Sequence, residues 1–231
     1  MDGFRFSGYR RVMGADFLRH VVRVVFWWIL CALGGIRIRG KENVPARGGV
    51  LLCPNHVCDI DPEVVYVALP RFAHYLAKEE LFPVPIVGAL MRLCKAIPIQ
   101  RDSADLKALR RAESVLKAGE ALVIFAEGGG NYENSLQPLQ PGALLIALRT
   151  RVPVIPVALV NTNAVMPYGT LRPRRASRPV EVIFGAPLDL SDLYGKRGAT
   201  EEATRRLTAR LAEMLGQPIP TGPYVPHDKR E

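Results

Sequence analysis

The fold is decided by residues 49–62, which read Gly-Val-Leu-Leu-Cys-Pro-Asn-His-Val-Cys-Asp-Ile-Asp-Pro. A glycine is followed by four apolar residues and then a proline, which is the pattern of a short buried strand. Pro62 favours the first position of a helix, and a largely apolar segment continues to Leu69 before Pro70 ends it. The stretch therefore predicts a buried strand, a polar loop and a helix.

The same order of strand, loop and helix recurs on both sides of this stretch. Further strands are predicted over 72–77, 95–99, 121–125, 153–159 and 180–184, and further helices over 84–93, 106–116, 142–150 and 201–215. This alternation favours an α/β fold, with a mixed, largely buried sheet flanked by helices. Sites in such sheets collect at the carboxyl ends of strands, so the loops after Cys53 and Phe125 are the candidates.

Composition excludes several classes of protein. The chain has 231 residues, of which 48% are hydrophobic and 23% charged, so it is neither collagen-like nor disordered. Its four cysteines do not form a disulfide framework, and reduced, cytosol-facing thiols are expected. We expect an N-terminal membrane-associating helical segment over 1–39, a domain over 40–216 and a proline-rich tail over 217–231.

The positive charge is concentrated near the two ends of the chain. The net charge is +9. Residues 1–50 carry nine Lys and Arg against three Asp and Glu (+6), residues 51–170 carry eleven of each, and residues 171–231 carry eleven against eight (+3). Because a nucleic-acid enzyme more often has its excess on the central body, we expect no nucleic acid. Anionic lipid or another phosphorylated partner fits better, with the Arg-rich stretch 171–178 as one contact.

An apolar run near the N-terminus predicts contact with a membrane surface. Residues 24–36 are uncharged, include Trp27 and Trp28, and have arginines on both sides. Thirteen residues fall short of the roughly 20 that a spanning helix needs. Flanking arginines and a tryptophan pair suit a helix lying among lipid head groups, on the cytoplasmic face. A buried core helix and a true membrane span are the alternatives.

His56 and Asp61 form a candidate catalytic dyad. On one helix a spacing of five would point them about 140° apart, so His56 must lie in the loop and Asp61 must open the next helix. Asp61 would then fix the imidazole tautomer, and the other ring nitrogen would take a proton from a substrate hydroxyl. This chemistry needs no protein nucleophile, metal or cofactor. The alternative is that Asp61 is only a helix cap and His56 only a satisfied loop residue.

Two other chemistries could use the same loop. Cys53, His56, Cys58 and Asp61 could bind a metal ion, although their spacing is not a familiar zinc pattern and no second cluster follows. Cys58 could act as a nucleophile, although catalytic Cys and His residues usually come from separate segments.

Asn55-His56, followed after four residues by Asp61, resembles the His-x4-Asp motif of the glycerolipid acyltransferases, specifically the PlsC-like 1-acylglycerol-3-phosphate acyltransferases. The resemblance extends over about residues 40–190, because further motifs follow in the family's order. Residues 77–102 resemble the family's second block, which implies that Arg101 binds the acceptor phosphate, since guanidinium pairs bidentately with phosphate. Lys78 could assist.

The segment Phe125–Asn131 resembles the family's Phe-Pro-Glu-Gly-Thr-Arg-Ser. Glu127 and Gly128 match that motif, which implies that this loop positions the acceptor head group. Gly130 stands where the family has arginine, and a glycine cannot replace that charge. Residues 152–159 and 184–188 resemble the family's later strands.

The resemblance implies an enzyme that transfers an acyl group from acyl-CoA or acyl carrier protein to a lysophospholipid hydroxyl, most simply that of 1-acylglycerol-3-phosphate, to give phosphatidate. It also implies a role for the N-terminal helix in seating the enzyme on a bilayer. Three alternatives remain: a lysolipid acceptor without phosphate, hydrolysis of the thioester, and a catalytically silent lipid-binding module.

Overall fold

A computed structural model of the protein describes residues 7–100, 105–131, 133–170 and 172–222. Its strands are β1 (Ile36–Arg39), β2 (Val50–Pro54), β3 (Ala73–Lys78), β4 (Ala96–Ile99), β5 (Ala121–Val123), β6 (Val154–Val160) and β7 (Val180–Phe184). Its α-helices are α1 (Ser7–Ala32), α2 (Asp61–Ala68), α3 (Pro85–Leu93), α4 (Leu106–Lys117), α5 (Gly142–Thr150), α6 (Thr162–Val165) and α7 (Ala199–Leu215).

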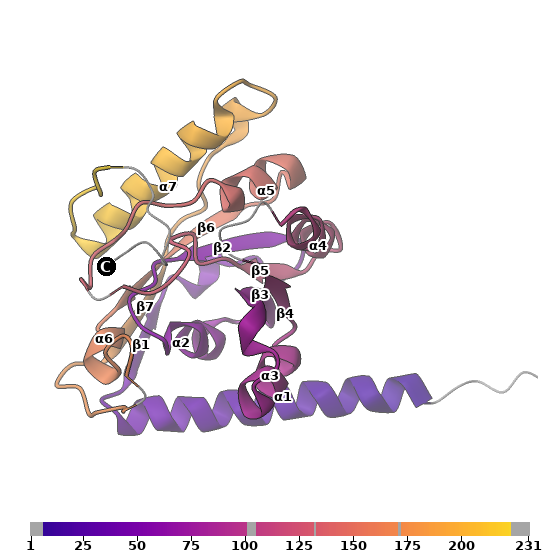
Figure 1. Ribbon diagram of the computed structural model, residues 1–231, viewed down its shortest axis with the longest axis vertical. Helices are drawn as coiled ribbons and strands as arrows, with labels where there is room; N and C mark the ends of the chain where they lie inside the picture. Colours follow the sequence, from indigo (N-terminus) through magenta and orange to yellow (C-terminus); the bar gives the residue numbers. More distant parts are fainter. Residues whose placement is uncertain (1–6, 101–104, 132, 171, 223–231) are drawn as a thin grey trace, which may run out of the picture.

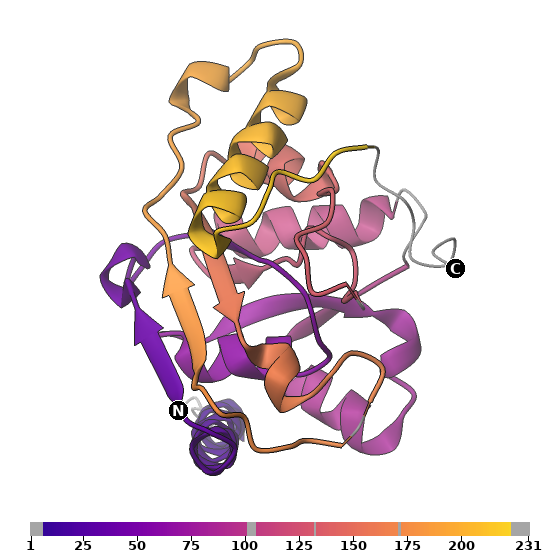
Figure 2. The same cartoon turned by 90° about the vertical axis from the view of Figure 1, so that its left-hand side faces the viewer.

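The strands form one mixed sheet in the order β1-β7-β6-β2-β5-β3-β4. The five strands from β6 to β4 are parallel, whereas β7 is antiparallel to β6 and pairs in parallel with β1. Helices α1, α2 and α3 lie on one side of the sheet, and α4, α5 and α7 on the other (Figure 1). Strands β1, β7 and β6 lie at one end of the sheet and face the viewer in Figure 2. The expected mixed α/β fold is confirmed.

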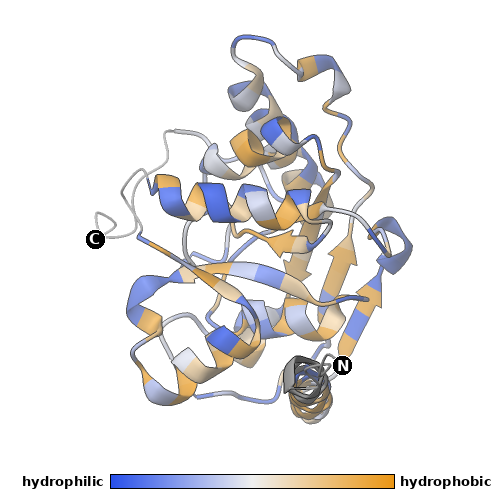
Figure 3. Ribbon diagram, turned by 90° about the vertical axis from the view of Figure 1, so that its right-hand side faces the viewer, coloured by the Kyte–Doolittle hydropathy of each residue, from blue (hydrophilic) through white to orange (hydrophobic). Residues whose placement is uncertain are grey.

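The central strand β2 contributes side chains to both layers of the core. Val50 and Leu52 pack in the cluster that includes α2, and Leu51 and Cys53 pack in the cluster that includes α5 and α7. Every residue of β2 is buried, because a parallel strand in the middle of the sheet is covered on both faces. The hydrophobic residues of the strands gather accordingly between the helical layers (Figure 3).

Two elements were not predicted from the sequence. The helical part of the N-terminal segment ends at Ala32, and Ile36–Arg39 forms the edge strand β1. Its apolar residues alternate with Arg37 and Arg39, which both pair with Glu181 of β7, so the strand has only two apolar positions to signal it. Helix α6 is a single turn of four residues, too short to show a hydrophobic period.

Helix α1 lies along the outer side of α2 and is hydrogen-bonded to the end of α3 (Figure 1). The Arg19 Nε donates to the carbonyl oxygen of Leu93 at 2.7 Å, and the Tyr66 hydroxyl donates to that of Arg19 at 2.8 Å. Arg23 stacks over the ring of Phe72, 4.7 Å from its centroid. The rest of the helix exposes large apolar side chains, namely Phe17, Leu18, Val21, Val24, Val25, Trp27, Trp28 and Ile29. Among the described residues, no helix has the length and apolarity to traverse a bilayer.

The parallel strands β2, β5, β3 and β4 are neighbours and end at the same edge of the sheet. His56 follows β2, Glu127 follows β5, and Lys78 is the last residue of β3. The topology therefore gathers residues that are far apart in the sequence along one edge, where sites form in open α/β sheets.

Candidate active site

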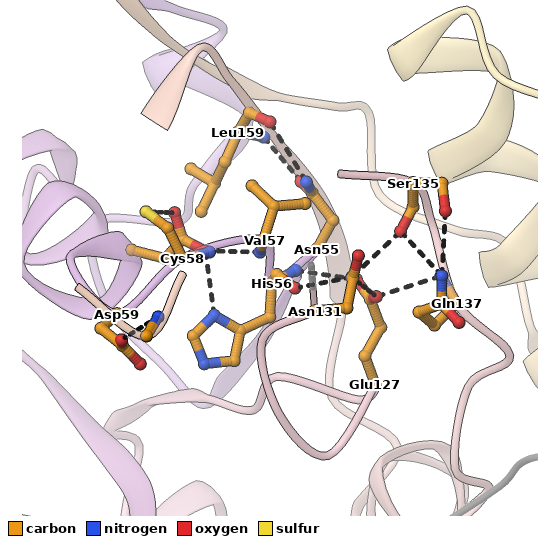
Figure 4. Close-up of polar contacts among 12 residues, drawn as sticks. Asn55, His56, Val57, Cys58, Asp59, Glu127, Asn131, Ser135, Gln137 and Leu159 are labelled. Carbon is orange, nitrogen blue, oxygen red and sulfur yellow. Dashed lines mark hydrogen bonds and ion pairs between the residues drawn. The ribbon is translucent and has the colours of Figure 1, made fainter. Parts of the chain in front are cut away.

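The imidazole of His56 is hydrogen-bonded to the carboxylate of Asp61. The two atoms concerned, His56 Nδ1 and Asp61 Oδ2, are 2.9 Å apart (Figure 4). Asp61 is fully buried and His56 is 8% exposed. On its other side the imidazole contacts the ring of Phe125, with 4.4 Å between the centroids. The structure thus brings together the two residues that the sequence singled out.

Asp61 opens α2, but its carboxylate points back into the loop rather than along the helix. The backbone N–H groups of Val57 and Cys58 donate to its Oδ2 at 2.7 and 2.9 Å. The Cys58 thiol donates to its Oδ1 at 3.3 Å. The N-cap position of α2 is Ile60, and the hydrogen bonds of the Asp61 carboxylate go to the loop, so a capping role alone does not explain Asp61. The loop folds around the carboxylate because a buried charge needs several donors.

This arrangement fixes which nitrogen of His56 carries the proton. An ionised carboxylate only accepts hydrogen bonds, so Nδ1 must be the donor to Asp61. The other nitrogen, Nε2, is then unprotonated in the neutral ring and able to accept a proton. Nε2 has no hydrogen-bond partner among the described residues. A histidine held in this tautomer is equipped to act as a general base.

Asn55 fastens the start of the loop to the sheet. Its Nδ2 donates to the carbonyl oxygen of Leu159 at 3.1 Å, and its Oδ1 accepts from the Leu159 N–H at 2.7 Å. The side-chain amide therefore extends the pairing of β2 with β6 by one step beyond the end of β2. Asn55 appears in the sequence motif, but only the structure shows that it positions His56.

Glu127 braces the backbone of His56. Its Oε1 accepts from the His56 N–H at 2.7 Å, and its Oε2 accepts from the Gln137 N–H at 3.0 Å. Asn131 donates to the His56 carbonyl oxygen at 3.2 Å and lies near Glu127 Oε2, at 3.4 Å. We expected Glu127 to position the acceptor head group. Its carboxylate is instead 1% exposed and engaged by backbone donors, which favours a positioning role for this side chain.

The other predicted binding residues are placed in different ways. Gly128 has a φ of +75° and donates its N–H to the carbonyl oxygen of Phe125, so it forms a tight turn that favours glycine. Lys78 is half-buried at the end of β3, on the same edge as His56. Arg101 lies outside the described residues. The strand that leads toward it, β4, ends at Ile99 on that same edge.

The structure also separates the arginines that could supply the charge missing at Gly130. Arg149 pairs with Glu113 at the end of α5, and Arg151 stacks on Tyr194 ahead of β6. Both lie at the amino end of β6, opposite the edge that carries His56. The stretch 172–178 joins β6 to β7 and leaves the sheet at the carboxyl edge of β6, so its arginines are on the side of the site.

The two rival chemistries of this loop find no support in the structure. Burial, with the negative charge of Asp61, raises the pKa of the Cys58 thiol far above its usual range, so this sulfur is no thiolate nucleophile. Burial raises the pKa of Cys53 to about 12, and its side chain packs on the other face of the sheet. The described residues hold no group of three His, Cys, Asp or Glu side chains that could bind a metal ion.

Glu63, in the first turn of α2, is a second carboxyl group close to the site. Burial, with the nearby charges of Asp61 and Asp59, raises the pKa of Glu63 from 4.5 to about 7. Its Oε2 is buried and has no hydrogen-bond partner within the described parts of the chain. An ionised Glu63 is therefore a cost to the folded state near neutral pH.

Comparisons with known sequences identify the family of this chain. A family model described as Acyltransferase matches residues 35–160. The chain is 33% identical over 192 residues to 1-acyl-sn-glycerol-3-phosphate acyltransferase of Bacillus subtilis, covering 83% of this chain and 89% of that protein. It is 30% identical to the enzyme of the same name from Cocos nucifera, covering 80% of this chain and 59% of that protein.

A solved structure shows the same fold. The crystal structure of the 1-acyl-sn-glycerophosphate acyltransferase PlsC from Thermotoga maritima superposes with a TM-score of 0.74. The match covers 89% of this chain and 82% of that one, at 20% sequence identity.

Replacing Asn55 by alanine should destabilise the protein. The buried N–H and carbonyl of Leu159 would both lose their partner, at a cost of about 2–4 kcal/mol in the free energy of unfolding. Urea unfolding measures this. Asn43→Ala is the matched control, because Asn43 makes a single bond, to the carbonyl oxygen of Phe184, and is only partly buried. Equal losses in the two variants would contradict the structural role that we assign to the two hydrogen bonds between Asn55 and Leu159.

Replacing Glu63 by glutamine should stabilise the protein only at higher pH. In the wild type, the pKa is higher folded than unfolded, so stability falls as pH rises from about 4.5 to about 7 and then stays level. Glutamine does not titrate, so the variant should gain up to about 3 kcal/mol over the wild type across that range. Melting temperatures at pH 4.5 and pH 8 measure the gain. A difference independent of pH, like that expected for exposed Glu42→Gln, would refute it.

Proposed function

We propose, from the premise that this chain belongs to the acyltransferase family, that it transfers a fatty acyl group from an acyl thioester to the free hydroxyl of 1-acylglycerol-3-phosphate, giving phosphatidate. The observation that carries the proposal is the hydrogen bond between His56 and Asp61 at the carboxyl edge of the sheet. The names of the relatives support the acceptor, and the geometry of the dyad supports the chemistry.

The proposed reaction is a direct transfer between two substrates. His56 Nε2 takes the proton of the acceptor hydroxyl while the oxygen attacks the thioester carbonyl. The tetrahedral intermediate then collapses, the C–S bond breaks, and the leaving thiolate takes the proton from the imidazolium. Asp61 stabilises the imidazolium and prevents rotation of the ring, because its Oδ2 is itself held by two backbone donors.

We propose that the acceptor phosphate binds near the basic residues at the carboxyl edge of the sheet. Lys78 ends β3, which lies beyond β5, so it is on the side of His56 away from β6. Arg101 lies outside the described residues and is proposed as a second phosphate contact from the family resemblance alone. Strands are about 4.8 Å apart, so the end of β3 lies about 10 Å from the end of β2. The phosphorus of 1-acylglycerol-3-phosphate is four bonds from the free hydroxyl oxygen, and the long side chain of Lys78 can span the remaining distance. Gly128 leaves the adjoining backbone accessible.

The donor is proposed to be acyl-CoA or acyl carrier protein, both of which are polyanionic. Helix α4 starts at the carboxyl edge of β4 and exposes Lys107, Arg110, Arg111 and Lys117. Beside it a groove of about 380 Å³ is lined by His74, Lys95 and Arg111, among others. This groove is remote from His56 and is not the reaction site. The exposed cations of α4 would attract an anionic donor.

The membrane partner is proposed to be the cytoplasmic surface of a bilayer, where the lysolipid resides. The exposed side chains of α1 form an apolar stripe that includes Trp28, which is 68% exposed, and α3 adds Ile86 beside it. Exposed apolar stripes of this size mark interaction sites. Tryptophan and flanking arginines suit the head-group region of a membrane.

His56→Ala should abolish the transfer. Loss of the base should lower kcat by about 10²–10⁴-fold in release of thiol from the donor with 1-acylglycerol-3-phosphate present. Asp61→Asn should also lower kcat, because an amide can present its N–H groups to the imidazole and favour the wrong tautomer. His74→Ala, outside the dyad, is the matched control. A folded His56→Ala variant with wild-type turnover would falsify the assignment of the base.

The same assay separates the alternatives. Product lipids identified by mass, with acyl-CoA and acyl carrier protein compared as donors, give the acceptor and the donor. Phosphatidate as the main product supports the proposal. Acylation of lysolipids without phosphate in its place, free fatty acid formed without acceptor, or no consumption of thioester would each overturn it.

Charged substitutions on α1 should release the protein from membranes. Val24→Glu combined with Trp28→Glu places two carboxylates in the exposed stripe, where burial among lipids is costly. Sedimentation with vesicles containing phosphatidylglycerol should fall strongly. Ile219→Glu, at a position that is 56% exposed and distant in the sequence, is the control. Unchanged sedimentation of the α1 variant would refute the docking surface.

A further inference from the structure

A short turn in the connection from β6 to β7 spans the loops on both sides of His56. We call residues 167–170 the acceptor turn. It is closed by the N–H and hydroxyl of Thr170, which both donate to the carbonyl oxygen of Pro167, at 3.1 and 2.8 Å. The turn follows α6, so it leaves the sheet at the carboxyl edge, as the loop of His56 does.

One side of the acceptor turn is fastened to the loop between His56 and Asp61. The Gly169 N–H donates to Asp59 Oδ2 at 3.1 Å, and Asp59, labelled in Figure 4, is three residues after His56. This contact joins segments that are 110 residues apart in the chain. It sets the position of Tyr168, the preceding residue, relative to the dyad.

The other side of the acceptor turn packs on the glycine loop after β5. A Cβ atom built on Gly130 would lie 2.5 Å from both Cδ2 and Cε2 of Tyr168, and its three nearest atoms all belong to that ring. Carbon atoms in van der Waals contact are about 3.5–4.0 Å apart, so even alanine would displace the ring. Gly130 also precedes Asn131, whose amide donates to the carbonyl oxygen of His56.

Two of the three glycines of this loop, Gly128 and Gly130, are therefore required for different reasons. Gly128 has a positive φ, so its backbone favours glycine. Gly130 has no positive φ, so its backbone would accept any residue, and the neighbouring ring alone demands glycine. The ring of Tyr168 occupies the volume into which a side chain at position 130 would begin to extend.

We propose that Tyr168 determines acceptor specificity, as a wall that limits the size of the head group reaching His56. This inference rests on the proposed function. The ring is held on one side by the anchor at Asp59 and on the other by Gly130, so its position is fixed relative to the dyad. A neutral wall at this place admits the compact phosphate of 1-acylglycerol-3-phosphate and excludes larger phosphodiester head groups.

Removing the ring should widen acceptor choice. In Tyr168→Ala, the ratio of kcat/KM for 1-acylglycerophosphocholine to that for 1-acylglycerol-3-phosphate should rise at least tenfold, within the range that steric pockets achieve. Tyr168→Phe keeps the ring and should therefore keep the wild-type ratio of the two kcat/KM values. The KM for the donor should change less than twofold. An unchanged ratio in Tyr168→Ala, or an equal rise in donor and acceptor KM, overturns the proposal.

Gly130→Ala supplies the second test, because it should act only through the ring. In the wild-type background it should lower kcat/KM for 1-acylglycerol-3-phosphate, and in the Tyr168→Ala background it should have no further effect. Losses of equal size in both backgrounds overturn the proposal. Tyr168→Leu replaces Tyr168→Ala if the latter melts below the assay temperature.

The activity of the wild type distinguishes failure of the Tyr168 proposal from failure of the proposed function. A wild-type protein that acylates lysophosphatidate but whose Tyr168 variants keep its selectivity refutes the wall and leaves the proposed function intact. A folded wild-type protein that acylates no lysolipid refutes both.

Discussion

The carboxylate of Asp61 is the constraint on which the rest of the site depends. It is fully buried, and its donors are the imidazole of His56, the backbone of Val57 and Cys58, and the Cys58 thiol. A charge that is removed from water must be met by donors, and the donors seen here all come from the loop that carries the histidine. The negative charge that supports the base thus also dictates the path of the loop.

Hydrogen bonds to the sheet and to the loop after β5 also fix the position of this loop. Asn55 continues the pairing of β2 with β6, and Glu127 bonds the backbone of His56 to the neighbouring strand's loop. With the backbone fixed on both sides, the only freedom left to His56 is rotation of its ring, which Asp61 and Phe125 restrict. Preorganisation of this kind lowers the cost of placing a base against a weakly acidic hydroxyl.

The departure of the glycine loop from the family motif has a structural counterpart elsewhere in the chain. The ring of Tyr168 stands over Gly130, so the missing side chain is compensated in volume by a residue that comes after a different strand. The arginines of 172–178 follow in the same connection. The glycine loop and the acceptor turn therefore pack against each other, and a substitution in one should affect the other.

The sequence by itself determined the alternation of strands and helices, because the period of apolar residues and the positions of proline and glycine are local properties. It also singled out His56 and Asp61, because their spacing fits a loop followed by a helix start and resembles the His-x4-Asp motif of the family. The edge strand β1 and the short helix α6 escaped prediction because four residues carry too little periodicity.

Only the tertiary structure decided what those residues contact. The order of strands in the sheet brought Glu127 and Lys78 to the edge that carries His56, and it sent Arg149 and Arg151 to the opposite edge. It also showed that the carboxylate of Glu127 bonds to the backbone N–H of His56. Such outcomes depend on pairing between strands tens of residues apart, for which no local pattern exists. Burial and contact are properties of the packed sheet and cannot be assigned to a residue before its neighbours are known.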